Sequence, residues 1–437
     1  MKCILYIPPF GVEGTNVSNI AMVQVGGLTL YSRACRCIQV ADFDEIIVVK
    51  PESLDCKPDS LIKIPVKFFS YVERVRECSD KIREVVEGET DICVCQLDGM
   101  LGPKCFKMRP KGADVRIIAN GEESGVFFMS LRTLNTLLDS EVSLDDIAGA
   151  VSETFVSPES TVYHRVVSAD DLKICQNVLT KSLKKPLGRD ADGLVAYFIN
   201  RPCSLRISKH LANTFVTPNM VSAFGLLLGL VAAGLVFTGI TFYMVIAVIL
   251  WQIASMVDGI DGELARMRMN PSHRGEWFDT VADDITNIAF LFGLGHGISQ
   301  STISGNPLFF YISSGVCVLM VIVVGWFYRE FVKLGIASHN HFEWGFETEN
   351  RENKSAEHRN IIRRALDKIA GGFAWVAKRD FYTFLIMCLV IIGYLSKIDA
   401  FYYAAFFIML TGATFVGVGG LIALTIRAFR GKRSKST

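Results

Sequence analysis

The sequence predicts two parts, an α/β domain in the first 185 residues and a bundle of six membrane-spanning helices after it. Short β-branched runs alternate with helical stretches before residue 185, whereas long apolar stretches dominate after Val216. The composition agrees, because 50% of the 437 residues are hydrophobic while 20% are charged. An ordinary soluble protein is less apolar than this, and membrane spans alone carry fewer charges.

Residues 1–185 show the alternation that is typical of a mostly parallel sheet covered by helices. The chain opens on a short apolar run that ends at Pro8, which predicts a strand and no signal peptide. Further strands are expected at 45–49, 61–66, 92–97, 115–119 and 161–166. Helices are expected at 27–40, 70–87, 130–139 and 170–184.

Residues 186–216 are expected to link the two parts. The stretch 201–215 mixes basic residues with Leu205, Leu211 and Phe215. This pattern is typical of an amphipathic helix that lies in the membrane interface with its apolar side inward, and a plain linker is the alternative. A second basic stretch at 355–379 fits an interfacial helix or a solvated connection equally well.

Residues 217–437 contain six apolar stretches close to the roughly twenty residues that the hydrocarbon core of a bilayer requires. We expect spans at 218–238, 241–265, 276–298, 307–330, 381–396 and 401–426. The third span begins with acidic residues, and only about fifteen residues follow Asp284. Its first turns are therefore expected at the level of the headgroups.

The distribution of Lys and Arg predicts the orientation of the spans. Basic residues gather in the turn near 270, in the loop after the fourth span and at the C-terminus, whereas the alternate connections hold only Lys397. The N-terminus, the acidic turn and the C-terminus are therefore expected in the cytoplasm, at a prokaryotic inner or plasma membrane.

Four carboxylates lie at fixed spacings beside the apolar stretches, namely Asp258, Asp261, Asp279 and Asp283. At about 100° per residue, the first two share one helix face and the last two form a stripe on the next helix. A turn near Asn270-Pro271 makes the two helices antiparallel neighbours, so the two acidic faces meet. Carboxylates beside a membrane span mark functional sites, and a hard divalent cation is their natural partner.

Small residues and one arginine accompany these carboxylates. Gly262, Ala265 and Gly275 allow close approach of a ligand, and Arg266 supplies planar donors suited to phosphate. Glu263 and Asp284 fall off the two acidic faces, so we expect them to take no part in a site. The alternative is a pair of solvated acidic helix ends, which would not need the small residues and the arginine at these offsets.

The pattern D-x2-D-G-x2-A-R-x8-G-x3-D-x3-D is identified as the signature of the CDP-alcohol phosphotransferases, membrane enzymes of phospholipid synthesis. All eight signature positions are present, and Thr217-Pro218-Asn219 also resembles the family. The resemblance implies that an acceptor hydroxyl attacks the β-phosphorus of a CDP-alcohol and that CMP leaves. It also implies a homodimer in the lipid bilayer and no nucleic acid partner.

The same resemblance implies roles for the signature residues. Two cations, Mg²⁺ or Mn²⁺, would be held by the four aspartates Asp258, Asp261, Asp279 and Asp283. Asp283 would also be the general base for the acceptor hydroxyl. The CMP site would be lined by Gly262, Ala265, Arg266 and Gly275.

The sequence leaves open which alcohol the CDP donor carries and which alcohol accepts the phosphate. CDP-diacylglycerol with a phosphorylated polyol is one pairing, and CDP-inositol with a lipid alcohol or inositol phosphate is the other. Arg329 and Arg379, at the cytoplasmic ends of predicted spans, are candidates for an acceptor phosphate, with snorkelling anchors as the alternative. An ion-coupled transporter is the competing class, although its carboxylates usually lie near mid-bilayer within repeats that are not visible in this sequence.

The N-terminal part resembles the nucleotidyltransferase domains that charge sugar or inositol phosphates, in segments at Gly26-Gly27, Gly125-Val126 and Asp170-Asp171. The combination resembles the fused cytidylyltransferase and dialkylether-inositol-phosphate synthase proteins of archaea and bacteria. Active members carry an Arg or Lys in a Gly-rich opening loop, whereas this chain has no basic residue between Lys2 and Arg33. We therefore expect that this domain has lost nucleotidyl transfer, and the alternative is a bifunctional enzyme. We also expect Asp98 to be a turn residue before Gly99.

Overall fold

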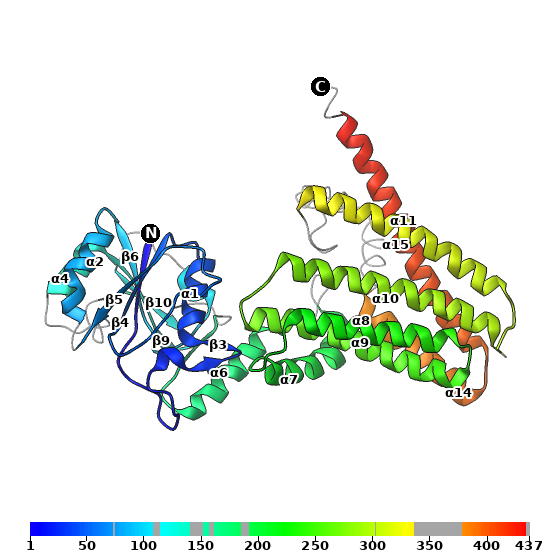
Figure 1. Cartoon of the computed structure of the whole chain (residues 1–437), viewed down its shortest axis with the longest axis horizontal. Helices are drawn as coiled ribbons and strands as arrows, with labels where there is room; N and C mark the ends of the chain where they lie inside the picture. Colours follow the sequence, from blue (N-terminus) through cyan, green and yellow to red (C-terminus); the bar gives the residue numbers. More distant parts are fainter. Residues whose placement is uncertain are drawn as a thin grey trace, which may run out of the picture. The chain divides into compact units, whose positions relative to one another are not determined.

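The computed structural model describes residues 1–72, 75–107, 114–139, 151, 153–156, 161–184, 192–301, 303–335 and 378–433 (Figure 1). Contacts between Cα atoms divide the chain into two compact units. The first is Met1–Lys184 with the short segments Lys209–Phe215 and Arg266–Asn270. The second is Lys185–Ser208, Val216–Ala265 and Pro271–Thr437.

The first unit is built on a seven-stranded sheet with strand order β10-β8-β9-β6-β1-β4-β5. Strand β9 runs antiparallel to both of its neighbours, whereas the other four pairings are parallel. The strands are β1 (Lys2–Tyr6), β4 (Glu45–Pro51), β5 (Val66–Tyr71), β6 (Asp91–Gln96), β8 (Val115–Ala119), β9 (Glu122–Ser130) and β10 (Glu153–Val156). The expectation of a mostly parallel α/β sheet is confirmed.

Helices and two short strand pairs complete the first unit. The helices are α1 (Leu30–Val40), α2 (Ser79–Val86), α3 (Pro103–Lys107), α4 (Leu131–Asp139) and α6 (Ala169–Ser182), with 3₁₀ turns η1 (Ile20–Met22) and η2 (Val75–Cys78). The pairs are β2 (Gln24–Val25) with β3 (Leu28–Thr29), and β7 (Gly99–Leu101) with β11 (Tyr163–Arg165). Ile82 of α2 and Leu134 of α4 pack with Ile47 and Val94 of the sheet in one buried cluster. Apolar residues on the faces of the central strands thus hold the helices on the sheet.

Two elements of the first unit differ from the sequence expectation. The prediction of a strand at 61–66 was wrong. The chain makes a turn there, in which the Ile62 N–H donates to Asp59 O, and the strand begins only at Val66. The helix expected at 70–87 consequently begins only at Ser79. Strand β9 was not expected. Its buried run Val126–Met129 is uniformly apolar, so it lacks the alternation of polar and apolar residues that predicts a strand with one exposed face.

The second unit consists of helices. They are the π-helical turn η4 (Ala196–Asn200), α7 (Arg201–Leu211), α8 (Pro218–Phe237), α9 (Thr241–Met267), α10 (His273–Gln300), α11 (Leu308–Leu334), α14 (Arg379–Ser396) and α15 (Ala400–Arg433). Helices α8, α9, α14 and the segment Leu308–Lys333 of α11 are long and apolar enough to cross a membrane. Among the described residues, the long helices α8, α9, α10, α11, α14 and α15 coincide with the expected spans, and a six-span topology stays a prediction.

Helix starts in the second unit follow from local capping. The Thr217 hydroxyl accepts the Met220 N–H at the start of α8, where Pro218 occupies the first turn. The Ser272 hydroxyl accepts the Gly275 N–H at the start of α10. Helix α7 ends at Leu211, so Phe215 lies outside it, and the Phe215 side chain is 84% exposed. The basic stretch at 355–379 lies outside the described residues except for its last two positions.

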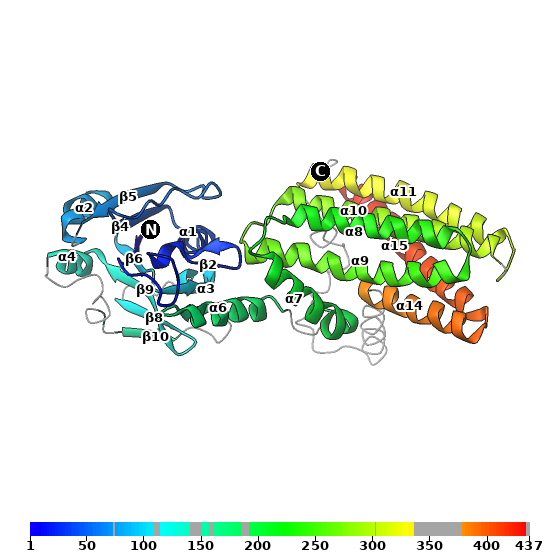
Figure 2. The same cartoon turned by 60° about the horizontal axis from the view of Figure 1, so that its bottom comes forward.

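Glycines bring α10 close to α8. A Cβ at Gly293 would lie 2.6 Å from the Ala233 carbonyl oxygen, and one at Gly297 would lie 2.1 Å from the Val236 carbonyl oxygen. Because these distances exclude any side chain, the two helix backbones touch. Helices α8, α9 and α10 run along one another in both views (Figure 2). At the other end of α10, the carboxylates of Asp279 and Asp283 lie close to that of Asp258 in α9.

Candidate functional site

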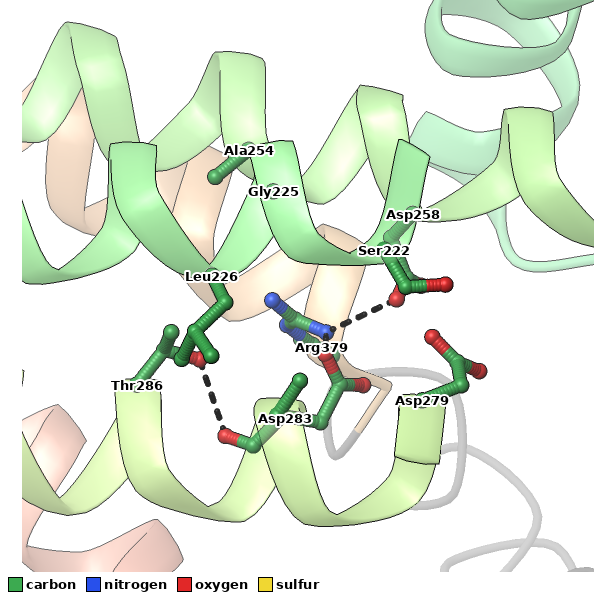
Figure 3. Close-up of a pocket in the computed structure, with 10 residues that line it drawn as sticks. Ser222, Gly225, Leu226, Ala254, Asp258, Asp279, Asp283, Thr286 and Arg379 are labelled. Carbon is green, nitrogen blue, oxygen red and sulfur yellow. Dashed lines mark hydrogen bonds and ion pairs between the residues drawn. The ribbon is translucent and has the colours of Figure 1, made fainter. Parts of the chain in front are cut away.

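Three carboxylates from two helices converge on one pocket (Figure 3). Asp258 comes from α9, and Asp279 and Asp283 come from successive turns of α10. One oxygen from each of the three lies within 4.8 Å of the other two. The pocket is lined by Ser222, Gly225, Leu226, Ala254, Asp258, Asp279, Ala282, Asp283, Thr286 and Arg379. The two acidic faces that the spacing predicts therefore meet.

Asp261 lies near the three converging carboxylates, but its own carboxylate is hydrogen-bonded to α8. Its carboxylate is buried and accepts short hydrogen bonds from the Ser222 hydroxyl of α8 and from the Gly262 N–H. Its side chain also lies within hydrogen-bonding reach of Asp279. Asp261 thus stands beside the three converging carboxylates and connects them to α8.

Arg379 brings a positive charge from a distant part of the chain. It is the first residue of α14, and its Nη1 atom lies 3.4 Å from Oδ1 of Asp258 and forms an ion pair with Oδ1 of Asp283. Arg329, the other candidate for an acceptor phosphate, is exposed on α11 and is not among the residues that line the pocket.

The donor set fits a divalent cation. Four carboxylates and one guanidinium leave a net charge of about −3 among largely apolar helices, and such a charge needs cationic partners. The convergent donors are all carboxylate oxygens, the ligands that hard cations such as Mg²⁺ and Mn²⁺ accept. Asp258, Asp279 and Asp283 are the residues placed to hold one.

The small signature residues and Arg266 are not among the residues that line the acidic pocket. Gly262 and Ala265 are half-buried on α9, and Arg266 is exposed at the last turn of that helix. A Cβ at Gly275 would lie 2.8 Å from the Ser272 hydroxyl and 3.0 Å from Oδ1 of Asn219. A side chain at Gly275 would thus displace the side chains of Ser272 and Asn219, so the start of α10 lies close to the Thr-Pro-Asn segment of α8.

Two residues that were expected to take no part in the site, Glu263 and Asp284, make hydrogen bonds to other helices, and that expectation stays a prediction. Glu263 is fully buried and accepts three hydrogen bonds, from Arg201, Ser204 and Ser208 of α7. Asp284 accepts a short hydrogen bond from the Tyr328 hydroxyl of α11. A signal for the first was available, because the polar residues 201, 204 and 208 follow helical spacing along one face of α7.

In the first unit, Asp98 was expected to be a simple turn residue. The structure shows that its side chain also makes buried contacts. Its side chain is 11% exposed and accepts a 3.1 Å hydrogen bond from the Tyr163 hydroxyl, and Arg165 Nε lies 3.9 Å from Oδ2 of Asp98. Burial raises the pKa of Asp98 to about 6, against the opposing effect of the Tyr163 hydrogen bond. Asp98 is therefore held by neighbours from β11.

The opening loop of the first unit is tied to the start of α6. The Glu13 N–H donates to Val167 O, and the Ala169 N–H donates to Glu13 O. The Asn19 amide donates to Pro8 O and closes the loop on itself. The backbone of this loop is thus engaged by the protein, and the sequence places no basic side chain on it.

Comparison with known proteins identifies the C-terminal part. Residues 215–341 match the family model described as CDP-alcohol phosphatidyltransferase, so this part of the chain is a domain of that family. The match confirms the resemblance that the signature carries. It includes all four aspartates and the small signature residues, but not Arg379.

Several relatives align with part of the chain. A protein of Aquifex aeolicus (strain VF5) named Bifunctional IPC transferase and DIPP synthase is 35% identical over 136 residues, which cover 31% of this chain and 30% of that protein. A protein of the same name from Thermococcus kodakarensis is 31% identical over 163 residues, 37% of this chain and 34% of that protein. The Archaetidylinositol phosphate synthase of Pyrococcus horikoshii is 32% identical over 95 residues, 21% of this chain and 47% of that protein. The alignments thus span between 30% and 47% of the length of these relatives.

Two solved structures match the N-terminal part. HddC from Yersinia pseudotuberculosis aligns with a TM-score of 0.33 at 14% identity, over 40% of this chain and 98% of that one. The inositol-1-phosphate CTP transferase from T. maritima aligns with a TM-score of 0.30 at 11% identity, over 40% of this chain and 95% of that one. At these TM-scores the likeness carries no conclusion about activity.

Proposed function

We propose that the protein is an integral membrane phosphotransferase that moves a substituted phosphate from a CDP-alcohol to an acceptor hydroxyl and releases CMP. The observation that carries the proposal is the convergence of Asp258, Asp279 and Asp283 within a domain of the CDP-alcohol phosphatidyltransferase family. The family match also favours an enzyme over an ion-coupled transporter.

Two divalent cations, Mg²⁺ or Mn²⁺, would be held by Asp258, Asp261, Asp279 and Asp283. Bound there, they would neutralise the pyrophosphate and stabilise the leaving phosphate. Ser222 would orient the Asp261 carboxylate through its hydrogen bond. Asp283 would accept the proton of the attacking hydroxyl, and the proximity of the Arg379 guanidinium would hold its carboxylate in place.

The nucleotide would lie over the small residues of the signature. Gly262, Ala265 and Gly275 leave room for the CMP moiety, and Arg266 would pair with a phosphate oxygen. Asn219 beside Gly275 supports this placement, because it adds a polar side chain at the rim of that space.

Arg379 is the stronger of the two candidates for an acceptor phosphate. It already lies at the carboxylates, within one side-chain length of the place where an acceptor hydroxyl must approach Asp283. The exposed position of Arg329 on α11 gives no such support. An arginine at this place would bring a phosphorylated polyol into line with the donor phosphate.

Among substrates, we favour an inositol-containing pair over CDP-diacylglycerol with another polyol. The names of the relatives support this choice, because one is an archaetidylinositol phosphate synthase. Two relatives are named as bifunctional, so the alternative is an N-terminal domain that makes the CDP-alcohol from CTP. The engaged opening loop without a basic residue favours a domain that has lost this step.

We further propose that the site faces the cytoplasm and that the protein is a homodimer in the bilayer. The distribution of Lys and Arg supports the orientation. Soluble CDP-activated substrates and inositol phosphates are found on that side. The dimer rests on the family resemblance alone.

The deciding experiment is CMP release by the purified full chain in detergent with Mg²⁺. CDP-inositol and CDP-diacylglycerol are each paired with inositol phosphate, and CDP-inositol is also paired with a lipid alcohol. We expect CMP from at least one pairing, dependent on the acceptor and lost in Asp279→Asn. No CMP from any pairing, with a folded protein and with Mn²⁺ tried as well, would refute the proposal.

A further inference from the structure

Glu263 is the most deeply buried carboxylate, among the described residues of the second unit, that the proposed reaction does not use. Its side chain has 0% exposure although it lies within the signature, between Gly262 and Ala265. Oε1 accepts hydrogen bonds of 2.7 Å from Arg201 Nη1 and 2.7 Å from the Ser204 hydroxyl. Oε2 accepts one of 2.7 Å from the Ser208 hydroxyl. A buried carboxylate is stable only with such donors.

All three donors come from α7. They recur at successive turns, so Glu263 joins α9 to about two turns of α7. Arg201 is itself fixed at its other side, because Nε and Nη2 donate to the Asp192 carboxylate at 2.8 and 3.2 Å. The group thus ties the segment before α7, α7 itself and α9 into one polar network.

The network lies beside the residues proposed to bind the nucleotide. A Cβ at Gly259 would lie 3.5 Å from Arg201 Nη1 and 3.7 Å from the Ser204 hydroxyl, so α7 packs directly on this glycine. At about 100° per residue, Gly259 and Glu263 share one face of α9, Gly262 lies about 60° from Gly259 at the edge of that face, and Asp258 points about 100° away from Gly259. Helix α7 therefore covers the side of α9 that adjoins Gly262, one of the residues proposed to line the CMP site.

We propose that Glu263 is a positioning residue, which holds α7 against α9 through Arg201, Ser204 and Ser208 and so shapes one wall of the CMP site. This inference rests on the proposed phosphotransferase function. A substitution at Glu263 should let α7 move away from α9 and weaken nucleotide binding. The chemical step should change little, because the four aspartates and Arg379 are untouched.

The native Cys203 gives a direct measure of α7 packing. It lies between Arg201 and Ser204 and is partly exposed, whereas ten of the twelve cysteines are buried and Cys388 is the remaining partly exposed one. In a Cys388→Ser background, the alkylation rate of Cys203 by a maleimide reports how tightly α7 is held. This readout needs neither substrate nor metal.

The variants are Glu263→Gln, which keeps the shape and removes the charge, and Ser208→Ala, which removes one donor. Glu330→Gln on α11 is the matched control, because Glu330 carries the same carboxylate in a surface pair with Lys333. We measure Cys203 alkylation, CMP affinity by calorimetry in Mg²⁺, and KM and kcat for the CDP-alcohol. Should Glu263→Gln fail to fold, Ser208→Ala gives the same test with a smaller effect.

For Glu263→Gln we expect faster Cys203 alkylation together with an increase of about tenfold in the Kd of CMP and in KM, the size of one lost charged hydrogen bond. We expect kcat to stay within about threefold and Glu330→Gln to match the parent protein. Faster alkylation with unchanged Kd and KM would overturn the positioning role, and so would unchanged alkylation. If the parent protein binds no CMP, the phosphotransferase proposal fails, and the proposed role of Glu263 at the CMP site fails with it. The alkylation rates of Cys203 still decide separately whether Glu263 anchors α7.

Discussion

The Nη1 atom of Arg379 lies 3.4 Å from Oδ1 of Asp258 and pairs at the same time with Asp283. One guanidinium thus bridges carboxylates from α9 and α10, and it does so from the first turn of a third helix, α14 (Figure 3). Arg379 lies outside the part of the chain that matches the family model. The fold therefore completes the acidic site with a cation from a separate segment.

The first prediction concerns Arg379. Arg379→Gln should raise KM for a phosphorylated acceptor by at least about tenfold, because a bidentate contact to phosphate is lost, and should also lower kcat. Steady-state kinetics with inositol phosphate as the varied substrate measure both values. Lys333→Gln, a surface cation paired with Glu330 on α11, serves as the control. A KM for the acceptor that does not change would remove Arg379 from the acceptor site, and a rise in KM for Arg329→Gln alone would move the role there.

The second prediction concerns the carboxylates. Asp258→Asn, Asp261→Asn or Asp279→Asn removes one charged oxygen from a site that must balance cations and a pyrophosphate. We expect CMP release to fall at least about a hundredfold in each case. Mn²⁺ binding, followed by electron paramagnetic resonance, should weaken in parallel. Near-normal turnover of any one variant at millimolar Mg²⁺ contradicts the two-cation site.

Local periodicity explains which parts of the site were predictable. Asp258 and Asp261 share a helix face, and Asp279 and Asp283 share another, so their convergence needed only two antiparallel helices. Glu263 was missed because its three donors lie on α7, some sixty positions earlier in the chain, and sequence spacing within α9 does not report them. Long-range contacts of this kind depend on tertiary packing.

The same limit applies to the sheet. Strands β4 and β8 were predicted almost to the residue, because each is a compact β-branched run bordered by turn residues. Strand β9 was missed although it is the longest, since both of its faces are buried and its pattern has no period of two. The side chain of Asp98 was misjudged because Tyr163 and Arg165 reach it from a strand far along the chain.

The third prediction concerns the pH dependence of Asp98. Burial raises its pKa from 3.8 to about 6, so the folded state binds the proton more tightly than the unfolded state between these values. The contribution of Asp98 to stability is therefore greatest below about pH 4, falls as the pH rises to about 6, and is lost above that. Asp98→Asn should abolish this dependence and raise the free energy of unfolding at pH 7.5 by up to about 3 kcal/mol relative to its effect at pH 4.

The measurement is hydrogen exchange of the β6 amides in the full chain across urea concentrations, at pH 4, 5, 6 and 7.5. Asp170→Asn is the control, because that carboxylate is 84% exposed and pairs only at the surface with Lys173. Equal pH profiles for Asp98→Asn and the parent protein would show that Asp98 does not carry the raised pKa.

The last prediction concerns the division of labour between the two parts. Residues 1–185 should fold as a soluble α/β domain but form no CDP-inositol from CTP and inositol phosphate. The reason is that the opening loop has no cation for a triphosphate and that its backbone is bonded to Val167 and Ala169. Residues 186–437 should keep CMP release, because the four aspartates and Arg379 all lie within them. Pyrophosphate release from CTP by residues 1–185, abolished by Asp98→Asn, would make the protein bifunctional. A folded but inactive fragment 186–437 would instead mean that the N-terminal domain contributes to the acceptor site.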